Sequence, residues 1–356
     1  MNGLHMRRHS MNGHTPASTH AKPFTLKYVK RILIDMTYQV LLYYQFTPIE
    51  EPQAFAKDHR EWLKERSLRG RIYVSAEGLN GTVAGTPEQM EEYMAMVREI
   101  PGFESIEFKI DECDYIPFAK LTCKVRKEIV ALHEEGVDPF EGGRRLSPEE
   151  WRAHFEQDED FILIDVRNDY ESKIGHFEGA ICPPVENFYD FPKWLDDAGL
   201  PKDKKVLMYC TGGIRCEKFS VVMKKKGWED VNQLHGGILN YAKKEQGKHF
   251  LGKCFVFDDR LAVPIDPEAQ DPLAACEITG QPTDHYLNCA NMECNRLFLC
   301  SEEGAKAYEG CCSEACMKSE VRRPFDPDTV YQPFRKWYNY FDDDFKQRSK
   351  SREQVS

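Results

Sequence analysis

The most informative segment of this chain is MYCTGGIRCEK (Met208–Lys218). It continues an apolar run, KKVLMYC (Lys204–Cys210), that is typical of a strand in a parallel sheet covered on both faces. Paired glycines then turn the chain, and a helix is predicted from about Ile214 to Lys226. Cys210 therefore lies where a buried strand ends and a helix begins. Open α/β sheets collect their chemistry at this edge.

The segments around this turn alternate between strands and helices. A helix is predicted to start at Ser147, and another opens in Gly236–Tyr241. Further strands are predicted at FILIDVR (Phe161–Arg167), at the end of the turn GHFEGAI (Gly175–Ile181), and at Val231–Leu234. We therefore expect residues 146–245 to form a doubly wound parallel sheet with helices on both faces.

Cys210 is the candidate catalytic residue. The active-site loop that follows it consists of Thr211, Gly212, Gly213, Ile214 and Arg215. The loop amides and the helix N-terminus direct partial positive charge at the sulfur, and Arg215 adds a permanent cation. These features favour the thiolate, the reactive form, so we expect a pKa for Cys210 below that of a free thiol. Cys216, in the first helical turn, is predicted to be packed rather than reactive.

The length of the loop bears on its chemistry. Four residues separate Cys210 from Arg215. Protein phosphatases with a cysteine nucleophile place five residues there, which makes a cradle wide enough for phosphate. The shorter loop suits a sulfane sulfur on Cys210 better than a phosphoryl group.

A separate domain is predicted over residues 38–132. Its expected elements are a strand at Val40–Phe46, a helix at Pro52–Ser67, strands at Arg71–Ser75 and Gly81–Gly85 around a turn at Gly78, Asn80 and Gly81, a helix starting at Thr86–Pro87, and a strand at Ile106–Ile110. This order is that of a ferredoxin-like α+β sandwich.

The third region, residues 271–320, is rich in cysteine. Seven of the 13 cysteines lie between Cys276 and Cys316. In a reducing compartment, clustered cysteines are more often metal ligands than disulfides. The candidate ligands of one structural zinc ion are Cys289, Cys294, Cys312 and Cys316. Free or oxidisable thiols are the alternative.

Composition and charge narrow the classes of function. No apolar run is long enough to span a bilayer, and no secretory signal is visible, so we expect a cytoplasmic protein without a membrane partner. The net charge of −11 argues against binding nucleic acid through an overall positive charge, but it does not exclude a local basic groove. The candidates for such a groove are Lys120, Lys124, Arg126, Lys127 and Lys224–Lys226. The alternative is that each of these clusters is simply a solvated face. Residues 1–36 are expected to be a flexible basic leader, and 321–356 a tail with a disordered end.

Three segments of the central region resemble those of rhodanese domains. DVRNDYE (Asp165–Glu171), GHFEGA (Gly175–Ala180) and CTGGIR (Cys210–Arg215) match the recurring rhodanese segments in order. In rhodaneses the loop cysteine carries a persulfide. The resemblance places Asp165 and Arg167 at the family's Asp-x-Arg, which we interpret as scaffold for the strand end and loops.

A narrower resemblance covers about residues 38 to 320. CTGGIRCEK, the preceding AEGLNGTVAG (Ala76–Gly85) and the later cysteine pattern together resemble the rhodanese-domain tRNA uridine(34) hydroxylases, whose first domain is acylphosphatase-like. The chain departs from that family at Thr279 and Glu303, where related sequences commonly have a second cysteine after Cys276 and Cys300.

The resemblance implies a monooxygenase-type oxidoreductase that converts the wobble uridine of tRNA to 5-hydroxyuridine with dioxygen. The implied partners are a tRNA anticodon loop and an unknown electron donor. The glycines at 78, 81 and 85 do not form a dinucleotide fingerprint, so no flavin or nicotinamide motif is recognised. A sulfurtransferase or persulfide carrier is the alternative, and a non-catalytic RNA-binding module is a third reading.

Overall fold

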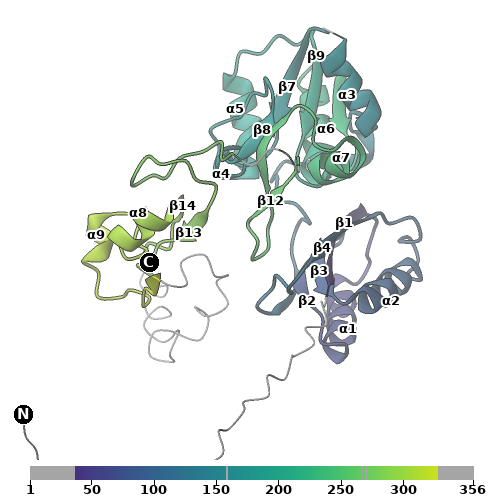
Figure 1. Ribbon diagram of the computed structural model, residues 1–356. Coiled ribbons are helices and arrows are strands. Elements are labelled where there is room, and N and C mark those ends of the chain that lie inside the picture. Colours follow the sequence, from purple (N-terminus) through teal and green to yellow (C-terminus); the bar gives the residue numbers. More distant parts are fainter. Residues whose placement is uncertain (1–36, 158, 267, 269–270, 328–356) are drawn as a thin grey trace, which may run out of the picture. The chain divides into compact units, whose positions relative to one another are not determined.

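The computed structural model describes residues 37–157, 159–266, 268 and 271–327 (Figure 1). The predicted leader and most of the predicted tail lie outside these ranges. Within them, no helix is both long enough and apolar enough to cross a membrane.

A five-stranded sheet with two helices forms the first part of the described chain (Figure 1). Its elements are β1 (Tyr38–Phe46), α1 (Pro52–Glu65), β2 (Arg69–Ser75), β3 (Gly78–Gly85), α2 (Pro87–Arg98), β4 (Phe108–Cys113) and β5 (Leu121–Val125). The order β4-β1-β3-β2, with antiparallel neighbours, is ferredoxin-like as predicted, and β5 adds a parallel edge strand next to β2.

Only one face of this sheet packs against the two helices. Leu41 and Tyr43 of β1 and Ile72 of β2 are fully buried in the core that α1 and α2 cover. Because side chains alternate between faces along a strand, Leu42, Tyr44, Arg71 and Tyr73 belong to the other face, which no helix of this domain covers.

The turn between β2 and β3 differs from the prediction. It lies at Ala76 and Glu77, so Asn80 and Gly81 are strand residues paired with Tyr73 and Ile72. The turn was predicted at the glycines because glycine is common in turns. Gly81 serves a different purpose here, since it allows close packing within the sheet. A Cβ at Gly81 would lie 2.3 Å from the hydroxyl oxygen of Tyr43.

The central region contains a parallel sheet of order β6-β10-β9-β7, doubly wound as predicted (Figure 1). Its elements are β6 (Arg144–Leu146), α3 (Pro148–Glu156), β7 (Phe161–Asp165), α4 (Asp169–Ser172), β8 (Gly175–Phe177), α5 (Phe191–Asp197), β9 (Lys205–Tyr209), α6 (Ile214–Lys225), β10 (Val231–Leu234) and α7 (Gly237–Glu245). The helices α5 and α6 pack on one face, and α3 and α7 pack on the other.

The segment GHFEGAI was wrongly predicted to lead into a strand of the parallel sheet. Residues Gly175–Phe177 form β8, which pairs antiparallel with β11 (Phe250–Phe255) in a separate three-stranded sheet with β12 (Ala262–Pro264). Ile181 makes only an isolated bridge to Ile164 of β7. A short apolar segment does not specify its partner strand, and β11 follows much later in the sequence.

The cysteine-rich region has little regular structure. It contains a hairpin of β13 (Tyr286–Asn288) and β14 (Leu297–Leu299), followed by the short helices α8 (Glu302–Ala307) and α9 (Glu314–Met317). Its small core consists largely of cysteine side chains.

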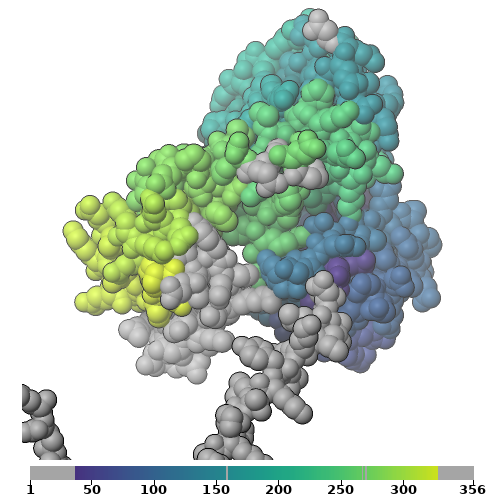
Figure 2. Space-filling model, viewed as in Figure 1, coloured from purple at the N-terminus to yellow at the C-terminus, as the bar shows by residue number. Residues whose placement is uncertain are grey.

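Two charged residues of α6 connect this helix to the first domain. The Lys218 ammonium, only 3% exposed as a residue, donates to Glu77 (2.9 Å) and Glu128 (2.7 Å). Glu217 accepts a hydrogen bond from the Tyr44 hydroxyl at 3.0 Å. The loop after β11 also touches the first domain, through the Asp259 amide and the Pro117 carbonyl (2.9 Å). In the space-filling view, the green part of the chain, to which this loop belongs, lies against the blue first domain (Figure 2).

Candidate active site

Cys210 lies directly after β9, in a cradle of backbone amides. The Gly213 amide donates to its sulfur at 3.1 Å. The loop itself is held by the start of α7, where the Ile238 amide donates to the Cys210 carbonyl at 3.0 Å. Gly213 has a φ of +103°, a conformation that favours glycine. The glycines thus allow the curl that the sequence predicted.

The surroundings of Cys210 stabilise its thiolate. Burial alone would raise its pKa. A hydrogen bond from Cys216, the charge of Arg215 and the amides of Arg215 and Gly213 outweigh burial and lower the pKa to about 5. The pKa of Cys216, which burial and the neighbouring thiolate raise, lies well above its usual range. This agrees with the expected thiolate at Cys210, and it gives Cys216 a role as hydrogen-bond donor.

Arg215 is held by a residue to which the sequence analysis gave no role. Its guanidinium forms a two-pronged ion pair with the carboxylate of Glu171, with one N–O distance of 2.8 Å, and Glu171 is fully buried. Thr211 also donates to Glu171, at 3.3 Å. Glu171 therefore orients the cation beside Cys210. The only available signal was its place at the end of the quoted DVRNDYE segment.

Asp165 and Arg167 form a fully buried pair away from the cavity that Cys210 lines. The Arg167 guanidinium donates to Asp165 (2.6 and 2.9 Å) and to the Gly175 carbonyl (2.6 Å), and the Tyr209 hydroxyl donates to Asp165 at 2.9 Å. The pair ties the ends of β7 and β9 to β8, an arrangement that suits scaffold residues.

Cys210 and its loop line a cavity of about 460 Å³ between the central region and the first domain. Both regions contribute to its walls. The lining residues are Leu42, Tyr44, Arg71, Tyr73, Asn80 and Thr82 of the first sheet, Arg126 and Glu128 to Ala131, Asn168, Asn187 to Tyr189, Cys210 to Gly212, Ile214, Arg215 and Phe257. The volume is in the range of small-molecule sites and has room for a pyrimidine base. Among the described residues, none donates a hydrogen bond to the buried Oδ1 of Asn168, one of the lining residues.

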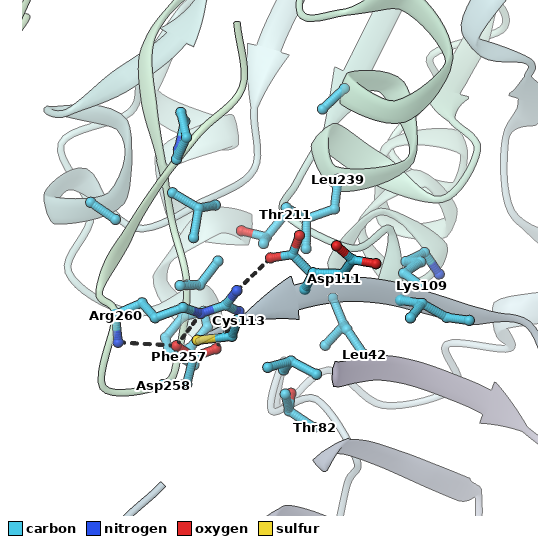
Figure 3. Close-up of a pocket in the computed structure, with 18 of the residues that line it drawn as sticks. Leu42, Thr82, Lys109, Asp111, Cys113, Thr211, Leu239, Phe257, Asp258 and Arg260 are labelled. Carbon is cyan, nitrogen blue, oxygen red and sulfur yellow. Dashed lines mark hydrogen bonds and ion pairs between the residues drawn. The ribbon is translucent and has the colours of Figure 1, made fainter. Parts of the chain in front are cut away.

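A second cavity, of about 640 Å³, is lined by Thr211 of the same loop (Figure 3). Leu42, Thr82, Thr211 and Phe257 line both cavities. Figure 3 shows Arg260 reaching toward Asp111 and Asp258, and the Arg260–Asp258 pair has an N–O distance of 2.7 Å. Thr211 of the loop thus borders both cavities.

The four cysteines proposed as zinc ligands lie together. Their sulfur atoms are all within 4.8 Å of one another, with 3.7 Å between Cys294 and Cys312 and 3.9 Å between Cys312 and Cys316. Zn–S bonds of about 2.3 Å in a tetrahedron separate the sulfurs by about 3.8 Å, whereas a disulfide needs about 2.05 Å. All of the described cysteines are free. This donor set fits a tetrahedral metal ion.

The lysine and arginine clusters divide into two kinds. Lys224 and Lys225 donate to backbone carbonyls of residues 136–142, and Lys226 pairs with Asp196. The contacts of this cluster are therefore made within the fold. Arg126 instead lines the cavity of Cys210, and Lys120 lines a neighbouring groove.

The fold and this loop define the class of the central region: a rhodanese-type domain with its loop cysteine and arginine both present. Residues 147–244 match the family described as "Rhodanese-like domain", residues 38–129 the "UPF0176 acylphosphatase like domain", and residues 251–317 the "Rhodanase C-terminal" family. A rhodanese-like domain from Anabaena sp. covers 30% of this chain and 78% of its own, at 23% identity and a TM-score of 0.26.

Relatives that match over nearly their whole length identify the particular family. A tRNA uridine(34) hydroxylase of Protochlamydia amoebophila is 41% identical over 313 residues, which are 87% of this chain and 98% of the relative. One from Staphylococcus aureus is 49% identical over 293 residues, 81% of this chain and 92% of the relative. The chain belongs to the tRNA uridine(34) hydroxylase family.

Proposed function

We propose that this chain hydroxylates carbon 5 of uridine 34 in tRNA, with dioxygen, to give 5-hydroxyuridine. The observation that carries the proposal is the activated Cys210 at the wall of a base-sized cavity closed by a second domain. The relatives over the same length are named for this reaction. A wobble base is unpaired and can be turned out of the anticodon loop into such a cavity.

Cys210 acts in this proposal as the nucleophile. Carbon 5 of uracil reacts poorly until a group adds to carbon 6, and covalent addition divides one difficult step into two easier ones. The sulfur adds to carbon 6, and one atom of dioxygen is bonded to carbon 5. The other atom leaves as water, with two electrons and two protons from an external reductant. Loss of the carbon 5 proton and departure of the sulfur restore the double bond.

The sulfur can act as a thiolate or as a persulfide. Cys210 has no exposed surface. A persulfide would place the reacting sulfur about 2 Å beyond Sγ, because an S–S bond has about that length. The burial of Cys210 therefore supports the persulfide form, and its lowered pKa supports an anionic sulfur in either form.

We further propose that Cys289, Cys294, Cys312 and Cys316 hold one structural zinc ion. The sulfur separations support a tetrahedral site, and the region that contains it has a core made mostly of cysteine. Small domains with so little apolar core commonly depend on a metal for stability. The ion would stabilise this region and take no part in the reaction. We place the protein in the cytoplasm with its tRNA substrate.

The test is nucleoside mass spectrometry of tRNA from cells that lack this protein. The cells are complemented with the wild type, with Cys210→Ser, or with Cys182→Ser as a matched control from outside the cavity. We expect 5-hydroxyuridine-derived nucleosides with the wild type and the control but not with Cys210→Ser. Equal nucleosides with all three would refute the role of Cys210. None with the wild type would favour the sulfurtransferase, which transfer of sulfur from thiosulfate to cyanide would then reveal.

A further inference from the structure

We propose that the open sheet face of the first domain and the ring of Phe257 together bind the single-stranded nucleotides that flank the target uridine. This inference rests on the proposed function and names the surface that holds the RNA. We call the surface formed by Arg71, Tyr73, Arg126 and Phe257 the nucleotide platform. In this proposal the first domain binds bases and is not purely structural.

The open face presents aromatic and basic side chains. Along β2, the buried Ile72 and Val74 alternate with Arg71 and Tyr73, which point away from the helices. Arg71 and Tyr73 both line the cavity of Cys210. Domains of this strand order are known to bind single-stranded RNA by stacking bases on aromatic residues of such a face.

Phe257 lies where three cavities meet. Its side chain borders the cavity of Cys210, the cavity in Figure 3, and a groove of about 420 Å³ that Lys120 and Asn288 also line. It is 44% exposed, although it is one of the larger apolar side chains. The Arg215 guanidinium carbon lies 5.9 Å from its ring centroid, which puts the ring next to the catalytic loop. An exposed ring in a concave site is available to stack on a base.

The charges on this surface suit a polyanion. Arg71, Lys124 and Arg126 are exposed, and none has a carboxylate partner within the described ranges. The Arg126 guanidinium carbon lies 5.4 Å from the Tyr73 ring centroid, so a cation and a stacking surface adjoin.

Two carboxylates that line the cavity or the groove beside the platform are paired within the fold. Glu128 binds Lys218, and Asp258 binds Arg260. The exposed Arg71 and Arg126 therefore place two positive charges on the platform of a chain whose net charge is −11.

The cavities give the RNA strand a path. Arg71 and Phe257 belong both to the cavity of Cys210 and to the adjoining groove. A base turned toward Cys210 would leave its neighbours over these two residues. Stacking on aromatic rings tolerates any base, since every base has a π face. The platform would thus hold the loop without reading its flanking sequence.

The experiment measures binding of a fluorescent anticodon stem–loop RNA by anisotropy, with the full-length protein. Tyr73→Ala and Phe257→Ala should each weaken binding about tenfold, and Tyr73→Phe should restore it. Arg126→Ala should lower the slope of log affinity against log salt by about 0.7, the contribution of one phosphate contact on a single strand. Phe140→Ala, which removes a 71% exposed ring outside the platform, should bind as the wild type does.

Two readouts separate the platform from the proposed function. The pH midpoint for alkylation of Cys210 by iodoacetamide should be unchanged in Tyr73→Ala, because the groups that set the pKa of Cys210 do not include Tyr73, and this shows that the loop is intact. If Tyr73→Ala and Phe257→Ala bind RNA as tightly as a wild type that forms 5-hydroxyuridine, the platform is refuted and the function stands. If the wild type binds RNA but forms no 5-hydroxyuridine, the function is refuted, and the binding series still decides the platform.

Discussion

Replacing Cys216 by alanine should raise the pKa of Cys210. Burial raises the pKa of Cys210, and the hydrogen bond from Cys216 is the first of the contacts that lower it to about 5. A hydrogen bond to a charged group contributes about 1.5–3 kcal/mol, and one pKa unit corresponds to about 1.36 kcal/mol. Loss of this bond should therefore raise the pKa of Cys210 from about 5 to about 6–7. Cys216→Ser keeps a donor and should leave the value near that of the wild type.

The assay is the pH dependence of alkylation of Cys210 by iodoacetamide, read by mass spectrometry on the peptide that contains it. This readout is required because the chain has 13 cysteines. Since the thiolate is the reacting form, the rate should be flat above the pKa of Cys210 and fall as the pH drops through it. A wild-type midpoint near 8 or 9, or the same midpoint in Cys216→Ala, would refute the hydrogen-bonded thiolate.

Three further variants test other parts of the structure. Glu171→Gln leaves the loop arginine without its buried carboxylate and should lower the free energy of unfolding by about 3–5 kcal/mol in urea titrations; a change under about 1 kcal/mol would contradict the pairing. Lys218→Met leaves Glu77 and Glu128 unpaired and, because both retain some exposure, should lower it by about 2–3 kcal/mol. Cys312→Ser should lose the zinc found by elemental analysis and melt at lower temperature, whereas Cys276→Ser should keep the metal. Equal zinc in both would exclude the assigned ligands.

The pH dependence of the free energy of unfolding provides a second test of the Lys218 variant, through the carboxyl group of Glu128. Burial raises the pKa of Glu128, but hydrogen bonds from Lys218 and from backbone amides outweigh it and leave the pKa below its usual value. A carboxyl whose folded pKa is depressed stabilises the fold above its unfolded pKa, and this contribution is lost as the pH falls through the folded pKa. Lys218→Met should therefore lose less stability on acidification than the wild type does. An equal loss would show that Lys218 is not what lowers the pKa of Glu128.

The parts that the sequence predicted correctly are those whose geometry is local. The strand end, the paired glycines, Arg215 and the helix start are consecutive, so the thiolate cradle follows from one segment. Glu171 was missed because it reaches Arg215 only after the chain has formed three further elements of the central region. The strand predicted at the end of GHFEGAI was misplaced for a related reason, since Gly175–Phe177 of this segment pair with β11, which lies far along the chain.

The open face of the first sheet shows how an error in the position of one turn changes which residues are predicted to share a face. Side chains alternate along a strand, so the position of the turn decides which residues share a face. With a turn at Gly78–Gly81, Asn80 does not belong to a strand. With the observed turn at Ala76–Glu77, Asn80 pairs with Tyr73 and lies on its face. Asn80 thereby joins Arg71 and Tyr73 in the wall of the cavity of Cys210.

The double glycine of the loop links the two domains as well as curling around the sulfur. A Cβ at Gly212 would lie 2.8 Å from Leu42 Cδ2, and one at Gly213 would lie 2.8 Å from the Tyr44 hydroxyl oxygen. Both partners belong to the open sheet face, so the absence of side chains at these positions lets that face approach the loop. A rhodanese loop alone needs no such approach to handle a small sulfur donor. The close fit to a second domain explains why the same cysteine cradle here opens into a cavity whose size suits a nucleobase.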